Sequence, residues 1–342
     1  MTNSPSVLIS IDRPPHISED LQPSELVGAG FLEVLPQAAI TTTPLANGGK
    51  GTAEIFGGAK ITLPTTDIAG RLIEASYIWA ADTATAYIDL AAASGVSAKT
   101  TASSLLLNDS YGTGVLIADA ETRGAQTIVL SLGDGLTIDG GTGILVALGA
   151  QPLDPRGYAV PKGGGYLGVI ESIDTAQLNI KAGAMNWILL ADAPFSLSGE
   201  TGVAKIMGDK LGAAPADIEI LENSLSHWAK ILEIDSTKPG LGAGGGIPLA
   251  LTWLSRLLYG NEDHVQILPA APVIAQSLGL AELLAATDLF ITTKANSTVL
   301  ELAAASPALT LLAAPLSEHP TAAEFKNLGR QLAQKYSAQQ AI

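Results

Sequence analysis

The order of apolar and polar positions predicts alternating strands and helices at both ends of the chain. Short apolar runs such as VLISI and DLFITT are typical of buried strands, and longer segments with a period near 3.6 are typical of amphipathic helices. The predicted strands are 7–11, 39–45, 288–293 and 308–314, and the predicted helices include 18–35 and 321–336. This alternation is typical of βαβ units.

The middle of the chain has a different pattern. From residue 59 onward, apolar and polar positions alternate, and turns at 67–70 and 82–83 predict paired strands. A helix over 110–123 and a buried strand over 127–132 follow. Because the similar ends flank a different middle, we predict one domain formed by residues 1–60 and 262–342, with residues 61–261 inserted as a second domain.

Composition narrows the class of protein. The 342 residues, 47% of them hydrophobic, suit two domains. A net charge of −15 opposes contact with nucleic acid. No apolar run is long enough to span a membrane and no secretory signal is found, so we expect a cytoplasmic protein without membrane partners. The chain has no cysteine, and its four histidines lack metal-ligand spacing.

Glycine-rich turns carry the candidate chemistry. ANGGKGT (46–52), SYGTG (110–114) and IDGGTG (138–143) could bring backbone N–H groups close to an anion. GGKGT does not have the spacing of a Walker A loop. Phosphoryl transfer would suit such turns, since it requires positioning groups and carboxylates that hold Mg²⁺. The alternative, that the glycines only allow tight connections, stays open.

These motifs resemble those of the glycerate kinase family of the two-domain bacterial type. PLANGGKGT is similar to the family's P-x-ADGGEGT, IDGGTGILVALGA to TNDGGAGMLxALGA, and PGLGAGGG to PGxGAAGG. The resemblance covers most of the chain. It implies two α/β domains, a flavodoxin-like three-layer domain formed by both termini and an inserted mixed α/β domain. It also implies phosphate transfer from ATP to glycerate with Mg²⁺.

The resemblance carries site residues over to this chain. Asp12, Asp139 and Asp192 take the catalytic positions. The substrate- and nucleotide-binding positions hold Asn47, Gly48, Gly49, Lys50, Ser110, Tyr111, Gly112, Thr113, Gly140, Gly141 and Lys294. No residue is singled out as a metal ligand.

Polar members of the motifs depart from the family pattern, whereas the glycines match it. At Lys50 and Lys294 a lysine stands where the family has glutamate, and this reversal of charge would repel Mg²⁺. The replaced positions hold Asn47, Lys50, Asp134, Gly135, Ile138, Phe195, Leu211, Lys294 and Thr298.

Three functions are consistent with these matches and departures. The first is a weak or inactive kinase that keeps the cleft for a small hydroxy acid and a nucleotide, as a binding or regulatory protein. The second is an active ATP-dependent glycerate kinase that uses ATP and Mg²⁺, with Lys50 and Lys294 as phosphate donors. The third is a structural or interaction protein with a vestigial cleft.

Overall fold

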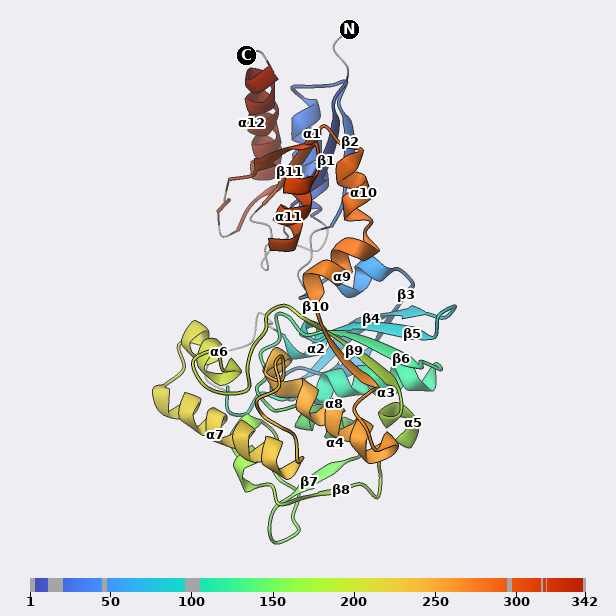
Figure 1. The fold of residues 1–342 in the computed structure, drawn as a ribbon, viewed down its shortest axis with the longest axis vertical. Coiled ribbons are helices and arrows are strands. Elements are labelled where there is room, and N and C mark those ends of the chain that lie inside the picture. Colours follow the sequence, from blue (N-terminus) through green and yellow to red (C-terminus); the bar gives the residue numbers. More distant parts are fainter. Residues whose placement is uncertain are drawn as a thin grey trace. The chain divides into compact units, whose positions relative to one another are not determined.

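The computed structural model describes residues 4–11, 21–44, 48–95, 105–293, 297–314, 316–317 and 319–340. Contacts within the chain define two compact units (Figure 1). Unit 1 comprises Met1–Asn47 and Ala271–Ile342, and unit 2 comprises Gly48–Ala270. The sequence placed these boundaries near residues 60 and 261. Segment 48–58 belongs to unit 2 because its backbone bonds to the strand that ends at Asp89, and the strand Val265–Pro269 belongs there because it pairs with Asn186–Ala191.

Unit 1 is a parallel sheet with helices on both faces. Its strands lie in the order β12-β11-β1-β2, so the first strand of the chain is central, as in flavodoxin-like sheets. The strands are β1 (Ser6–Ser10), β2 (Ala39–Thr42), β11 (Leu289–Thr292) and β12 (Leu309–Leu312). The helices are α1 (Pro23–Leu32), α9 (Ala270–Ser277), α10 (Leu280–Ala285), α11 (Ser297–Ala305) and α12 (Ala322–Gln340).

The alternation of side chains along β1 and β11 produces two cores in unit 1. Val7 and Ile9 pack with Phe31 of α1 and Phe325 of α12 on one face. Leu8 packs on the other face, with residues of α10 and α11. A strand buried on both faces reads as a continuous apolar run, which explains VLISI. Unit 1 thus has the three layers that the sequence predicted.

Unit 2 is built around a six-stranded mixed sheet in the order β10-β9-β6-β5-β4-β3. Four strands are parallel, namely β5 (Thr85–Asp89), β6 (Thr127–Ser131), β9 (Asn186–Ala191) and β10 (Val265–Pro269). The antiparallel β3 (Ala59–Thr66) and β4 (Leu72–Ala80) complete the sheet and confirm the predicted strand pairs. Because β5, β6 and β9 are parallel, their carboxyl ends meet at one edge, where α/β sheets commonly bind ligands.

Helices cover the sheet of unit 2, and a small hairpin packs beside α4. The hairpin is β7 (Gln151–Leu153) with β8 (Ser172–Asp174). The helices are η1 (Ala53–Phe56), α2 (Ala91–Ser94), α3 (Tyr111–Thr122), α4 (Thr142–Ala147), η3 (Gly164–Val169), α5 (Ile180–Gly183), α6 (Val203–Leu211), α7 (Pro215–Ile231) and α8 (Ala243–Tyr259).

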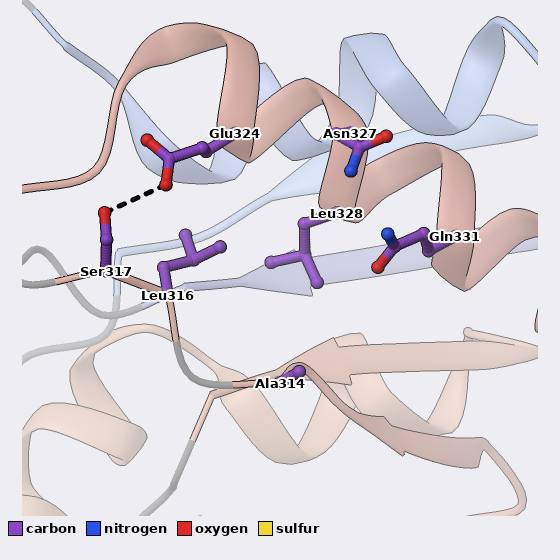
Figure 2. Close-up of a pocket in the computed structure, with 7 residues that line it drawn as sticks. All are labelled: Ala314, Leu316, Ser317, Glu324, Asn327, Leu328 and Gln331. Carbon is purple, nitrogen blue, oxygen red and sulfur yellow. Dashed lines mark hydrogen bonds between the residues drawn. The ribbon is translucent and has the colours of Figure 1, made fainter.

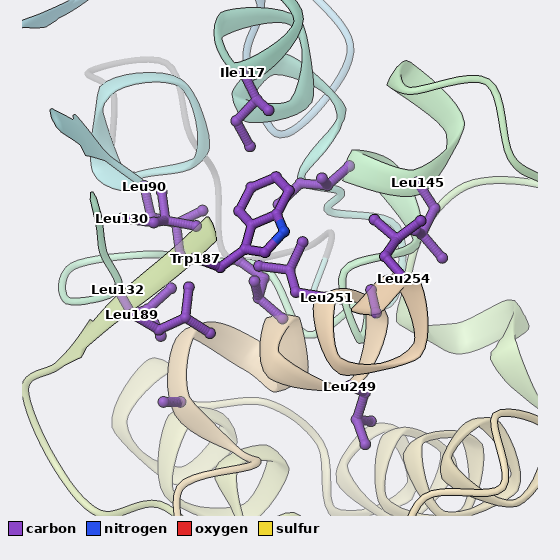
Figure 3. Packing of buried hydrophobic residues seen from close by; sticks show 14 of the residues in the cluster. Leu90, Ile117, Leu130, Leu132, Leu145, Trp187, Leu189, Leu249, Leu251 and Leu254 are labelled. Carbon is purple, nitrogen blue, oxygen red and sulfur yellow. The ribbon is translucent and has the colours of Figure 1, made fainter. Parts of the chain in front are cut away.

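Trp187 of β9 lies in the centre of the core of unit 2. Its ring extends among side chains of three helices, including Ile117, Leu145 and Leu251 (Figure 3). All four residues are fully buried. Burial of apolar area on this scale makes the largest favourable contribution to the stability of the unit.

A glycine run in the first turn of α8 has non-helical backbone angles and allows close packing. Gly244, Gly245 and Gly246 have φ values of 57°, 75° and 93°, a region that L side chains rarely adopt. A Cβ on Gly245 would overlap the carbonyl oxygen of Thr137. The geometry of this run therefore favours close packing.

We predict that Gly245→Ala destabilises the protein far more than Gly157→Ala. Both glycines have left-handed φ values, 75° and 79°, but a Cβ at Gly157 would meet open space. The control should cost about 1 kcal/mol and Gly245→Ala about 3 kcal/mol or more in urea unfolding. Equal costs for the two variants would contradict the packing role.

Candidate functional site

A glycine loop lies at the carboxyl edge of the sheet in unit 2. This loop, residues 48–52, directs its backbone N–H groups at protein carboxylates. The N–H of Gly51 donates to Asp89 Oδ2 at 2.7 Å, and the N–H of Ala53 donates to Asp89 Oδ1 at 2.9 Å. The N–H of Lys50 donates to Asp134 Oδ2 at 3.1 Å. The loop is therefore held by two carboxylates at the ends of β5 and β6.

Asp89 is the buried member of this pair. Its side chain is 7% exposed at the end of β5. Burial raises the pKa of Asp89 to about 6, although hydrogen bonds from the N–H groups of Ala53 and Gly51 oppose the shift.

Asp134 is the exposed member, and its backbone has a left-handed φ of 57°. The preceding N–H of Gly133 donates to the carbonyl oxygen of Gly48 at 2.7 Å, so the turn after β6 and the glycine loop are joined. A Cβ on Gly49 would overlap the Asp134 carboxylate. Only glycine at position 49 allows this approach.

Asp192 follows β9 at the same edge. Its side chain reaches solvent, but partial burial of its carboxylate raises its pKa, and the nearby charge of Asp134 raises it further. The charge of Lys210, at the end of α6, lowers it. The edge thus brings together two exposed carboxylates, one lysine and the glycine loop.

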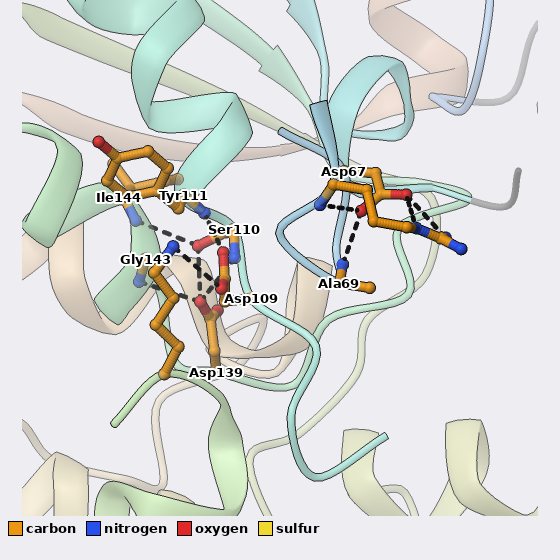
Figure 4. Close-up of polar contacts among 10 residues, drawn as sticks. Asp67, Ala69, Asp109, Ser110, Tyr111, Asp139, Gly143 and Ile144 are labelled. Atoms are coloured by element: carbon orange, nitrogen blue, oxygen red, sulfur yellow. Dashed lines mark hydrogen bonds and ion pairs between the residues drawn. The ribbon is translucent and has the colours of Figure 1, made fainter. Parts of the chain in front are cut away.

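A second group of predicted site residues lies in the interior. Asp139 is fully buried, and its carboxylate accepts hydrogen bonds from the N–H and hydroxyl of Ser110, both at 2.8 Å (Figure 4). The N–H groups of Gly141 and Gly143 also donate to it, both at 3.0 Å. Asp139 therefore ties the start of α3 to the start of α4. Burial raises its pKa, and these donors oppose the shift.

The neighbours of Asp139 serve packing. Thr113 is fully buried and its hydroxyl pairs with that of Ser94 at 2.8 Å. A Cβ on Gly112 would overlap the carbonyl oxygen of Thr66, and Cβ atoms on Gly140 and Gly141 would crowd Trp228 and Ala250. The Nε1 of Trp228 donates to the carbonyl oxygen of Gly140 at 3.0 Å. These residues have no surface to offer a ligand in this structure.

Tyr111 is the predicted residue of this group that is partly exposed. Lys162 Nζ lies 4.0 Å from the centre of its ring and 3.6 Å from Asp109 Oδ2. Asp109 is 2% exposed, and burial together with the charge of Asp139 raises its pKa to about 6. Lys162 partly offsets this shift.

Comparison with known proteins decides the family. A sequence profile described as the glycerate kinase family matches residues 7–298. This chain belongs to the glycerate kinase family. Glycerate 2-kinase of Escherichia coli (strain K12) is 36% identical over 251 residues, 70% of this chain and 66% of that protein. Glycerate kinase of Halalkalibacterium halodurans is 30% identical over 282 residues, 80% of this chain and 72% of that protein.

A solved structure agrees with this membership. The crystal structure of putative glycerate kinase 2 from Salmonella typhimurium LT2 superposes with a TM-score of 0.75 at 26% identity, covering 99% of this chain and all of that one. The two-domain α/β fold is thereby shown. In sequence, the aligned region spans about two thirds of the Escherichia coli protein.

The structure shows where two of the residues that depart from the family motifs lie. Ile138 is fully buried in the core, so its loss of a polar side chain is a packing change rather than the loss of a ligand contact. Leu211 packs against the core where the family motif has lysine, while Lys210 is exposed and acts on Asp192. A lysine thus stands one residue before the motif position, on the exposed side of the helix.

Sequence reasoning missed Asp89, Asp109 and Lys210. Asp89 stands at the end of a strand, where α/β sheets commonly place ligand-binding groups, and could have been found on that ground. Asp109 directly precedes the SYGTG turn. Asp12, Asn47 and Lys294 lie outside the described residues, and their predicted roles stay predictions.

Two further features bear on function. In unit 1 a pocket of about 260 Å³ lies between α12 and residues 314, 316 and 317, and no predicted site residue that the structure describes lines it (Figure 2). Its lining residues are Ala314, Leu316, Ser317, Glu324, Asn327, Leu328 and Gln331.

Among the helices of the described segments, none is long and apolar enough to cross a membrane.

We predict that Asp139→Asn destabilises the protein by about 2–4 kcal/mol, because the new amide group would face N–H donors that the carboxylate now accepts. Asp154→Asn is the matched control. Asp154 lies in a surface turn and accepts the N–H groups of Arg156 and Tyr158 on one oxygen, which an asparagine can still provide. Its other oxygen pairs with the exposed Arg156 side chain, and the loss of such a surface ion pair costs little. Chemical unfolding measures both. A stable Asp139→Asn protein would contradict the structural role.

We also predict that stability falls as pH rises from about 4 to about 6. The pKa values of Asp89 and Asp109 are about 6 in the folded protein against an ordinary 3.8. In this window the folded chain holds protons that the unfolded chain has released, so each rise in pH favours unfolding, by up to about 1.4 kcal/mol per pH unit for each group.

Urea unfolding at pH 5 and pH 7.5 tests this sign. High salt screens repulsion among surface charges but affects buried groups little. The dependence should therefore persist in about 0.5 M salt and weaken in Asp109→Asn. A dependence abolished by salt would contradict the assignment to buried carboxyls.

Proposed function

We propose that unit 2 keeps the ligand edge of a glycerate kinase but that transfer of phosphate from ATP to glycerate is weak or absent. Family membership supports a kinase ancestry, and the relatives named above are glycerate kinases. The proposed ligands are a small hydroxy acid and a nucleotide. The protein would then act as a ligand-binding or regulatory relative of the enzymes.

The observation that carries the proposal is the state of the glycine loop. A loop that binds phosphate needs backbone N–H groups free to meet it. Here the N–H groups of Lys50, Gly51 and Ala53 donate to the carboxylates of Asp134 and Asp89. An incoming phosphate would have to displace a carboxylate and approach a second one, and both steps oppose binding.

The donor set offers limited support for Mg²⁺. No group of three or more His, Cys, Asp or Glu side chains among the described residues is placed to hold a metal. Mg²⁺ often uses one or two carboxylates with phosphate oxygens, and Asp192 fits that use through its exposed carboxylate. When bound, Mg²⁺ would neutralise phosphate charge. Asp192 would orient such a complex, and Lys210 would balance its charge.

The second candidate is an active ATP-dependent glycerate kinase. It is favoured by the displaced lysine, because Lys210 supplies a positive charge near Asp192 where the motif residue is Leu211. Phosphoryl transfer depends mainly on positioning and charge, so a shifted lysine could still serve it.

A coupled assay for ADP release separates the two. We expect the full-length chain, with glycerate, ATP and Mg²⁺ at millimolar concentration, to turn over below about 1 s⁻¹, under the ordinary enzyme range. Escherichia coli glycerate 2-kinase in the same mixture is the positive control.

Turnover at or above about 1 s⁻¹ would refute the proposal and establish the second candidate. In that case Lys210→Ala should lower turnover, whereas Lys205→Ala, on the same helix and paired with Asp209, should not. A rise in melting temperature with glycerate alone would support the retained ligand edge.

A further inference from the structure

We propose that Asp134 acts as a built-in anion that occupies the glycine loop of unit 2 and sets its selectivity against anionic ligands. The inference deepens the proposed function and rests on it, since it names the residue that keeps phosphate groups from the loop. Three observations carry it.

The first is the backbone of Asp134. Among the described residues, three that are not glycine have a positive φ, namely Ala84, Asp134 and Glu233. A left-handed conformation is unfavourable for a residue with a Cβ, and such strain marks positions that the surroundings impose. Position 134 is one of those at which this chain departs from the family motif, and the departure places a carboxylate in the turn after β6.

The second is where that carboxylate lies. Its Oδ2 accepts the N–H of Lys50 at 3.1 Å, and Gly49 leaves just the space it fills. The neighbouring bond from the N–H of Gly133 to the carbonyl oxygen of Gly48, at 2.7 Å, holds the two turns in register. Asp134 thus lies over the loop as a ligand anion would.

The third is accessibility. Asp89 takes the N–H groups of Gly51 and Ala53 from the buried side and is 7% exposed, so solutes do not reach it. Asp134 is exposed and accepts the N–H of an exposed residue, Lys50. The nearby charge of Asp192 adds to the negative field. Removal of the Asp134 carboxylate therefore frees a donor and reduces repulsion together.

The test compares Asp134→Gly with the wild type for binding of inorganic pyrophosphate, by calorimetry on the full chain without divalent metal. Glycine suits the left-handed backbone, so the turn should be kept. We expect the variant to bind at least about tenfold more tightly. Asp134→Asn should gain less affinity for pyrophosphate. It removes the negative charge, but its amide oxygen can still accept the N–H of Lys50.

Glu233→Gly is the matched control. It removes one exposed negative charge from a left-handed position, φ 56°, at the end of α7, where its described hydrogen bonds are with Lys230 and Arg256. Glu233→Gly therefore changes net charge and backbone strain in the same way as Asp134→Gly, but it leaves the glycine loop unchanged. Its pyrophosphate affinity should stay within about twofold of the wild type, a change below about 0.4 kcal/mol.

An affinity gain below about threefold in Asp134→Gly, or an equal gain in Glu233→Gly, would overturn the inference. If Asp134→Gly does not fold, Asp134→Asn decides by the same threefold limit. The affinity ratio needs neither glycerate nor turnover. A wild-type chain with ordinary kinase turnover would thus contradict the proposed function alone, and an unchanged ratio would contradict this inference alone.

Discussion

The buried carboxylate of Asp139 is the interaction on which the arrangement of unit 2 depends. It accepts two hydrogen bonds from Ser110 at the start of α3 and two more from Gly141 and Gly143 at the start of α4. A charge buried completely is tolerated only with such a full set of donors. The two helices it joins pack on the sheet beside Trp187. The position of the turns at the carboxyl edge follows from this anchor, since the strand β6 leads directly into the segment that ends at Asp139.

That edge concentrates negative charge in a chain that is already acidic. Asp89 ends β5, Asp134 lies in the turn after β6 and Asp192 follows β9, and these neighbouring parallel strands have their carboxyl ends at one edge of the sheet. Backbone N–H groups of the glycine loop stabilise two of these carboxylates, and Lys210 acts on the third. The result is a site that satisfies its own donors. A phosphate-binding loop has the opposite property, because its donors must be left for the ligand.

Much of this could be predicted from the sequence. Apolar runs such as VLISI identified the buried strands of unit 1, and alternation identified the β3–β4 pair, because burial imposes those periods directly. The domain boundaries and the arrangement of the site were harder to predict from the sequence. Segment 48–58 belongs to unit 2 through hydrogen bonds to Asp89, which no local pattern encodes. Asp139 stood beside glycines in a ligand-like motif, yet it is buried, and α7 and α8, far along the chain, pack against the adjacent Gly140 and Gly141. The one-residue displacement from Leu211 to Lys210 needed the helix to show which side chain faces the edge.

The packing of the glycines limits what their match to the family motifs indicates about function. Gly112, Gly141 and Gly245 match the family motifs, and each has a backbone or side-chain neighbour that a Cβ would overlap. Selection for the fold alone would keep them, so their presence says nothing about kinase activity. Ile138 is likewise a core position.

The departures that bear on chemistry are the exposed ones at the edge, where Asp134 meets the glycine loop and Lys210 meets Asp192. The case for altered chemistry therefore rests on a few surface contacts rather than on the number of replaced motif residues. Among them, the bond from the N–H of Lys50 to Asp134 bears most directly on the loop, because it places a carboxylate where an anionic ligand would bind.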